Sequence, residues 1–167
     1  FGTINSAYEF NGISNTIQAP VVMSSYSISL WYYTNSVTNI FNNLYTYNNT
    51  YTELTNDSSL YARVQYPTPP SLSLPTTYKA EFNQWHHVIV IYKSVLNTLD
   101  IYIDSVNHFS SILTNDGIYY PSWENNTIYF GGIVLNNSNY FKGKIDDIGI
   151  YIFFFNDTAT TEIYTNS

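Results

Sequence analysis

The sequence predicts an all-β fold, a sandwich of two antiparallel sheets, on three observations. Short runs that alternate apolar and polar residues recur along the chain, and no helical period is sustained. The composition favours strands, since 18 Tyr and 10 Phe accompany many Val, Ile and Thr residues. A length of 167 residues with 44% hydrophobic residues suits one domain with its own core.

The clearest expected element is a hairpin within residues 82–104. The run 85–92 is largely apolar on both faces, which predicts a central strand that is covered on two sides. We therefore expect Trp85, and Trp31 of an earlier strand, to lie in the core. A polar connector follows, and residues 99–104 then alternate sharply, so the two runs form a hairpin with a loose loop.

Before this hairpin we expect four strands, separated by loops rich in Asn, Thr and Tyr. The first ends in the turn signal Asn11-Gly12. Residues 66–77 contain four prolines, which exclude a helix or a central strand and predict an extended loop or an edge segment. The four expected strands cover residues 7–12, 27–33, 40–47 and 59–65.

After the hairpin we expect three further strands. The first is followed by a turn at residues 115–117, and the second ends in the paired glycines Gly131-Gly132. A polar loop over residues 134–139 leads to the last strand. The three expected strands cover residues 106–113, 127–132 and 141–151.

Four of these stretches together resemble the laminin-G-like domains of the concanavalin A-like lectin/glucanase superfamily. The resemblance covers residues 7–151 and implies a concanavalin A-like jelly roll in which the first and last strands lie side by side. The family usually has glycine after the Asp that ends the hairpin, whereas this chain has Ser105. The matching motifs are Phe10-Asn11-Gly12, Ile28-Ser29-Leu30-Trp31, Asn83-x-Trp85-His86-His87-Val88 with Leu99-x-Ile101-Tyr102-Ile103-Asp104, and Phe141-x-Gly143-x-Ile145-Asp146-Asp147-x-x-Ile150-Tyr151.

The chain divides into a laminin-G-like domain over residues 1–152 and an atypical tail over residues 153–167. Residues 156–165 resemble the translation of a widely used sequencing-library adapter, and we interpret the tail as a read-through artefact. The alternative is an imitation of the family's Ser-x-x-Glu-Ile ending. No function is drawn from this tail.

Charge and composition exclude several classes of partner. The net charge is -7 and only five residues are basic, so neither nucleic acid nor an anionic membrane is an expected partner. No apolar run approaches the roughly 20 residues that a spanning helix needs. There is no cysteine, hence no disulfide or thiolate site. Because the chain begins at Phe1 without Met, we expect a mature, excised or truncated piece of a longer product. As a recognition module of the laminin-G-like kind, it is expected to belong to a larger multidomain protein that is extracellular or on the cell surface.

A hydrolytic site is not expected. The glucanase branch of the superfamily uses the pattern Glu-x-Asp-x-x-Glu, and none of the five glutamates here lies in it. Asp146 and Asp147 are adjacent and face opposite ways on a strand, so they cannot act as a carboxylate pair. The same reasoning prevents His86 and His87 from sharing one metal ion, and we expect both to be structural.

Calcium is the ion that this chain suits best, because carboxylates, amides and carbonyls are abundant and many members of the superfamily bind it. The resemblance implies that Asp146 or Asp147 lies near the Asn11-Gly12 turn, which makes Asn11, Asp146 and Asp147 the candidate ligands of a structural ion. The alternative is that these residues cap loops or bond backbone amides.

Loop aromatics beside asparagines suggest a carbohydrate site, since sugar C–H faces stack on rings while amides bond the hydroxyls. We expect a non-catalytic recognition module that binds a glycan or an extracellular protein. The alternatives are a structural or adhesive subunit that self-assembles and a degenerate glycoside hydrolase. The candidate ligand-binding residues are Tyr47, Asn49, Tyr119, Trp123, Asn125 and Tyr140.

Overall fold

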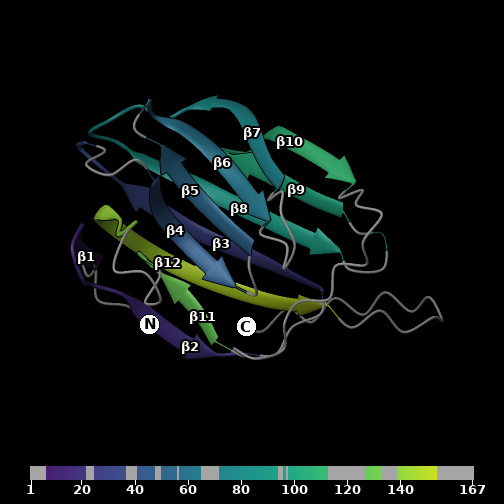
Figure 1. The fold of residues 1–167 in the computed structure, drawn as a ribbon, viewed down its shortest axis with the longest axis horizontal. Coiled ribbons are helices and arrows are strands. Elements are labelled where there is room, and N and C mark those ends of the chain that lie inside the picture. Colours follow the sequence, from purple (N-terminus) through teal and green to yellow (C-terminus); the bar gives the residue numbers. More distant parts are fainter. Residues whose placement is uncertain are drawn as a thin grey trace.

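Two antiparallel sheets of six strands each lie face to face in the computed structural model, as Figure 1 shows. The strands are β1 (Tyr8–Asn11), β2 (Ile17–Pro20), β3 (Ser25–Tyr33), β4 (Phe41–Tyr47), β5 (Thr50–Thr55), β6 (Ser59–Val64), β7 (Leu72–Lys79), β8 (Trp85–Lys93), β9 (Thr98–Ile103), β10 (Val106–Ile112), β11 (Thr127–Phe130) and β12 (Lys142–Phe153). The structure describes residues 7–21, 25–36, 41–47, 50–55, 57–64, 72–93, 96, 98–112, 127–132 and 139–153. The tail after residue 153 lies outside this part.

The first sheet, here sheet I, has the order β1-β12-β3-β8-β9-β10, and sheet II has the order β2-β11-β4-β5-β6-β7. β1 pairs with β12, with Tyr8 opposite Ile145, which confirms that the first and last strands lie side by side. β8 lies between β3 and β9, so its expected place inside a sheet is also confirmed. The fold is the predicted all-β sandwich.

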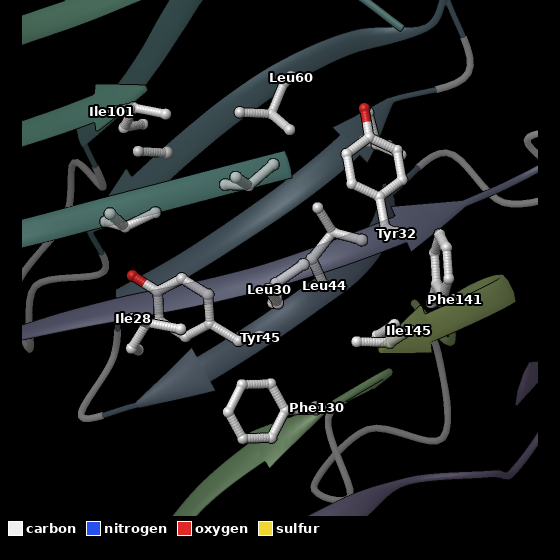
Figure 2. Close-up of a cluster of buried hydrophobic side chains, with 14 of the residues drawn as sticks. Ile28, Leu30, Tyr32, Leu44, Tyr45, Leu60, Ile101, Phe130, Phe141 and Ile145 are labelled. Atoms are coloured by element: carbon white, nitrogen blue, oxygen red, sulfur yellow. The ribbon is translucent and has the colours of Figure 1, made fainter. Parts of the chain in front are cut away.

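The core lies between the sheets and is built by alternation along their strands. In β3, for example, Ile28, Leu30 and Tyr32 point inward and are each at most 1% exposed. They meet side chains of β4 in sheet II and of the closing strand β12, as Figure 2 shows. Several core residues are tyrosines, and burial raises the pKa of Tyr45 to about 12. The labelled core residues of Figure 2 are Ile28, Leu30, Tyr32, Leu44, Tyr45, Leu60, Ile101, Phe130, Phe141 and Ile145.

Most of the expected strands are present, and two were missed. Of the two missed strands, β2 has only four residues and ends in Pro20, so its sequence shows little alternation. β5 is rich in threonine, and its Thr52 is fully buried although polar residues usually lie at the surface. The proline-rich stretch contributes β7, which contains Pro75 and is the edge strand of sheet II, as predicted. Proline is tolerated there because no further strand needs its missing N–H.

The prediction that both faces of β8 are covered was wrong. His86, Val88 and Val90 on the inner face are buried, but Trp85 on the outer face is 40% exposed. The other outer residues of β8 are only half-buried. An apolar residue on a strand therefore did not imply a second covering layer, since β-branched and aromatic residues also favour a sheet face that is open on one side.

The turn between β9 and β10 is tight although it lacks glycine. Asp104 and Ser105 both adopt the left-handed region, with φ of 49° and 70°. The Asp104 amide donates a hydrogen bond of 2.9 Å to the His87 carbonyl on β8. Ser105 therefore holds a conformation that glycine adopts without steric cost.

Candidate functional site

The outer face of sheet I carries two rows of aromatic and charged side chains across its strands. The strand register places Glu9, Lys144, Tyr33 and Trp85 in one row, on β1, β12, β3 and β8. The next row contains Asp146, Trp31 and His87. Neighbouring strands are about 4.8 Å apart and the two rows are about 7 Å apart, so these side chains share one continuous surface.

Four of these residues form what we call the aromatic ledge: Trp31, Tyr33, Trp85 and His87. The Trp31 and His87 rings stack with centroids 4.9 Å apart and an interplanar angle of 19°. The Tyr33 and Trp85 rings are 5.7 Å apart and tilted by 51°. The His87 ring is held in place by Ser29, whose Oγ lies 2.8 Å from His87 Nε2. The ledge therefore has a defined orientation before any ligand arrives.

The ledge corrects the prediction that both tryptophans belong to the core, since Trp31 is 38% and Trp85 is 40% exposed. For Trp31 the sequence contained the signal. It lies on the same face of the strand as Ser27 and Ser29, while the opposite face is apolar. A tryptophan in register with serines is typical of the open face of a sheet.

A pocket of about 510 Å³ lies beside the ledge, at the β1, β12 and β3 end of sheet I. Its residues come from both ends of the chain and from the loops after β1 and β3. Tyr33 belongs to both the ledge and the pocket, so the two form one site. The pocket is lined by Glu9, Phe10, Asn11, Asn15, Tyr33, Asn35, Lys142, Gly143 and Lys144.

Gly143 allows the chain to pass close to β3 at the base of this pocket. Its φ is 152°, and a Cβ there would lie 2.1 Å from the carbonyl oxygen of Tyr33, closer than any side chain tolerates. The buried hydroxyl of Thr34 donates a bond of 2.8 Å to the Lys142 carbonyl, which ties β12 to the end of β3. The two lysines flanking Gly143 are positioned by this contact.

The loop after β1 forms one wall of the pocket and is stabilised by Asn11. Its Oδ1 accepts hydrogen bonds from the amides of Ile13 at 2.8 Å, Ser14 at 2.9 Å and Asn15 at 3.3 Å. The Asn11 amide in turn donates to Asn15 Oδ1 at 3.1 Å. Asn11 thus shapes the pocket through an Asx-type turn.

The pocket also contains two basic residues that form no ion pair within the described part of the chain. Lys79 pairs with Asp57 and Lys93 with Asp100, both at 3.3 Å. Lys142 and Lys144 are exposed, and neither forms an ion pair with any residue in the described ranges. Glu9, opposite Lys144 in the register, is the acidic residue of the lining.

Of the six residues predicted to bind a ligand, the described part of the chain includes Tyr47 and Tyr140, and both are buried. Tyr47 and Tyr140 are 1% and 6% exposed, so their rings lie inside the fold and not on loops at the surface, contrary to expectation. Tyr47 packs edge-on against Tyr26 with centroids 5.4 Å apart. The remaining four candidates, Asn49, Tyr119, Trp123 and Asn125, lie outside the described residues.

The predicted calcium ligands are also separated. Asn11 is opposite Lys142, four residues from Asp146 and thus about 13 Å along β12. Asp147 has a φ of 47° at a bulge, and its amide donates a bond of 2.9 Å to Asp146 Oδ1. Within the described residues no group of three or more His, Asp or Glu side chains could hold a metal ion. Calcium binding stays a prediction.

The adjacent histidines face opposite sides, as expected, and both have structural partners. His86 is 4% exposed, and its Nε2 lies 2.9 Å from the Glu81 carbonyl oxygen. Its Nδ1 lies 2.7 Å from Asp104 Oδ2. Asp104 Oδ1 accepts a further bond of 2.8 Å from the His87 amide. The Asp104 carboxylate therefore contacts both the buried His86 side chain and the backbone amide of His87 on β8.

Fold and sequence together define the class of protein. Residues 11–158 match a laminin G family described as the concanavalin A-like lectin/glucanases superfamily. The chain belongs to this family. A search of curated proteins finds no match. In the part of the chain that the structure describes, no helix is long and apolar enough to cross a membrane.

Similar solved structures agree with the fold. Domain 4 of the extracellular arabinanase AbnA from Geobacillus stearothermophilus, in complex with arabinotriose, has a TM-score of 0.63 and 23% identity over 90% of this chain and 72% of that one. The CBM40 of the Ruminococcus gnavus IT-sialidase, bound to α2,3 sialyllactose, has a TM-score of 0.67 and 14% identity over 90% and 94%. NanB sialidase from Streptococcus pneumoniae has a TM-score of 0.65 and 15% identity over 90% of this chain and 26% of that one. The chain is thus similar in structure to carbohydrate-binding modules, which are domains of larger enzymes.

Proposed function

We propose that this domain is a non-catalytic carbohydrate-binding module, and that the aromatic ledge with its adjoining pocket is the binding site. The observation that carries the proposal is the pair of half-exposed tryptophans on the open face of sheet I. Exposed aromatic clusters with polar neighbours mark interaction sites on soluble domains. Sugars are ligands that combine apolar C–H faces with hydroxyl groups, and this surface offers partners for both.

The chemistry follows from the two rows. Trp31, Tyr33 and Trp85 offer ring surface on which the C–H faces of a sugar stack, at low entropic cost because the rings are already packed against neighbours. Asp146 lies next to Trp31 in the register and offers carboxylate oxygens to sugar hydroxyls. In the pocket, Asn15 and Asn35 supply amide donors and acceptors.

Three structural relatives support the proposal through what their names record. The arabinanase domain was solved with arabinotriose and the sialidase CBM40 with sialyllactose. NanB is a larger chain that contains a similar fold over about a quarter of its length. By analogy, this domain acts as part of a larger extracellular protein and brings that protein to a glycan.

The proposal is tested by glycan-array screening followed by calorimetry on the purified chain. Trp85→Ala and Trp31→Ala each remove one stacking surface, and each should weaken binding about two- to tenfold, since stacking on one aromatic ring contributes roughly 0.5–1.5 kcal/mol. Tyr8→Ala is the matched control. Tyr8 is more exposed than either tryptophan but lies on the other side of β1 from Glu9. Equal affinities for all four proteins would refute the site.

A second candidate function is favoured by the same exposed rings. A flat aromatic sheet face also suits a protein partner or a second copy of this chain. Light scattering over a range of concentrations separates the two functions. A monomer that binds glycans supports the module, whereas oligomers that dissociate in the Trp85→Ala variant and no glycan binding support assembly.

A further inference from the structure

We propose that the pocket selects sugar units that carry an anionic group, a carboxylate or a sulfate, and that Lys142 and Lys144 make this selection. This inference rests on the proposed carbohydrate-binding function and adds the class of ligand. Its basis is the placement of positive charge on a chain that has very little of it.

The two lysines form a local basic island. The chain has five basic residues against 12 acidic ones, yet two of the five lie two residues apart on the same side of β12. Lys79 and Lys93 are paired with Asp57 and Asp100, so their charge is already compensated. Lys142 and Lys144 have no such partner among the described residues. Their ammonium groups are therefore available to an anion at the pocket.

The register links this charge directly to the ledge. Lys144 on β12 is opposite Tyr33 on β3, and Tyr33 is opposite Trp85 on β8. Adjacent strands are about 4.8 Å apart, which is close to the width of one pyranose ring. A sugar stacked on Tyr33 thus places a substituent beside Lys144, and the next unit of the glycan reaches Trp85 or Trp31.

The lining contains features that suit an acidic sugar beyond simple attraction. Amide groups of Asn15 and Asn35 face the same pocket and can bond ring hydroxyls next to the anionic group. Glu9 is directly opposite Lys144 on the edge strand β1 and lines the same pocket, so its charge disfavours an anion on that side of Lys144 and favours the side of Tyr33. The net charge of -7 makes the rest of the molecule a poor surface for an acidic glycan, so binding should be confined to this island.

The test compares binding to three probes that share one neutral core: lactose itself, sialyllactose with a carboxylate, and sulfated lactose with a sulfate. The glycan array adds further pairs of an acidic glycan and its neutral counterpart. We expect at least one anionic probe to bind about fivefold or more tightly than its neutral partner, with a preference that shrinks at high salt. Lys142→Gln and Lys144→Gln should each reduce that preference, measured as the ratio of anionic to neutral affinity, by roughly threefold. Lys79→Gln carries the same change of net charge at a remote position and should leave the preference intact.

The outcomes separate this inference from the proposed function. Glycan binding that depends on Trp85 but shows no preference for the anionic member of any pair overturns the inference and leaves the module intact. A preference that survives in both lysine variants also overturns it. Absence of binding to every glycan, neutral or acidic, overturns the proposed function and the inference together.

Discussion

Replacing Asp104 by alanine should destabilise the domain more than its position in an exposed turn suggests. The carboxylate accepts a hydrogen bond from His86 Nδ1 at 2.7 Å and from the His87 amide at 2.8 Å. The His86 side chain is buried, and its other nitrogen faces the Glu81 carbonyl at 2.9 Å. A carboxylate oxygen can only accept, so His86 Nδ1 donates to Asp104, and alanine would leave this buried donor without a partner.

The size of the effect follows from these contacts. A buried donor without a partner costs about 1–3 kcal/mol, while the exposed His87 amide can bond water. The Asp104 side chain is 45% exposed, so water also reaches His86 in part, and we expect a loss of about 2 kcal/mol. For a domain of this size that loss lowers the melting midpoint by roughly 4–8 °C.

Chemical denaturation monitored by tryptophan fluorescence measures this loss, with Asp104→Asn as the control. Asparagine keeps an acceptor for the His87 amide and tolerates the left-handed conformation, so it should retain about half of the stability that alanine loses. In a His86→Ala background the Asp104→Ala change should lose most of its effect. Wild-type stability in Asp104→Ala, or an alanine variant no less stable than the asparagine variant, would refute the reasoning.

Three further predictions follow from other contacts. Ser105→Gly should stabilise the domain by about 0.5–1 kcal/mol because glycine adopts the φ of 70° without steric cost, and a denaturation midpoint that falls would contradict this. Hydrogen bonds from Thr55 and Ser59, with Lys79 alongside, hold the pKa of Asp57 well below its usual value of 3.8. Since the pKa of Asp57 is lower in the folded state, its contribution to stability is present above pH 3.8 and is lost as the pH falls below that value. Asp57→Asn should therefore flatten the fall in melting midpoint between about pH 5 and about pH 2. Parallel curves for the variant and the wild type would count against this prediction. A calcium ion bound at Asp146 and Asp147, as predicted, should raise the melting midpoint, so a chelator should lower it. An unchanged melting midpoint would contradict the prediction of a structural calcium ion.

Much of the fold could be predicted from the sequence because the side chains of a strand point alternately to its two faces, and apolar residues at every second position therefore mark the face that packs in the core. Ile28, Leu30 and Tyr32 were assigned to one face of a strand, and all three lie in the core. The closing motif was expected beside the first strand, and the register of Tyr8 with Ile145 confirms it. The first of these predictions depends on a period of two residues, which is local and visible in the sequence. The second depends on the resemblance of the closing motif to the last strand of the family.

The site could not be predicted in the same way because it depends on contacts between distant residues. Glu9 and Lys144 lie near opposite ends of the chain, and only the pairing of β1 with β12 makes them neighbours. Tyrosine is a poor guide to exposure, since its ring suits the core and its hydroxyl suits water. Tyr47 is buried and Tyr33 lines the pocket, although both are tyrosines in strands.

The stability of the core and the geometry of the ledge are coupled through β8. Its inner face presents His86 to the core, and its outer face presents Trp85 and His87 to the ledge. Asp104 bonds the His86 side chain and the His87 backbone at once, so it fixes the strand on both sides. A loose β8 would leave the rings of the ledge without a defined spacing and would add an ordering cost to every binding event. In the proposed site, the histidine pair and Asp104 therefore support glycan binding by fixing β8, without contact between His86 and the glycan. Asp104→Ala should weaken binding even where the domain remains folded.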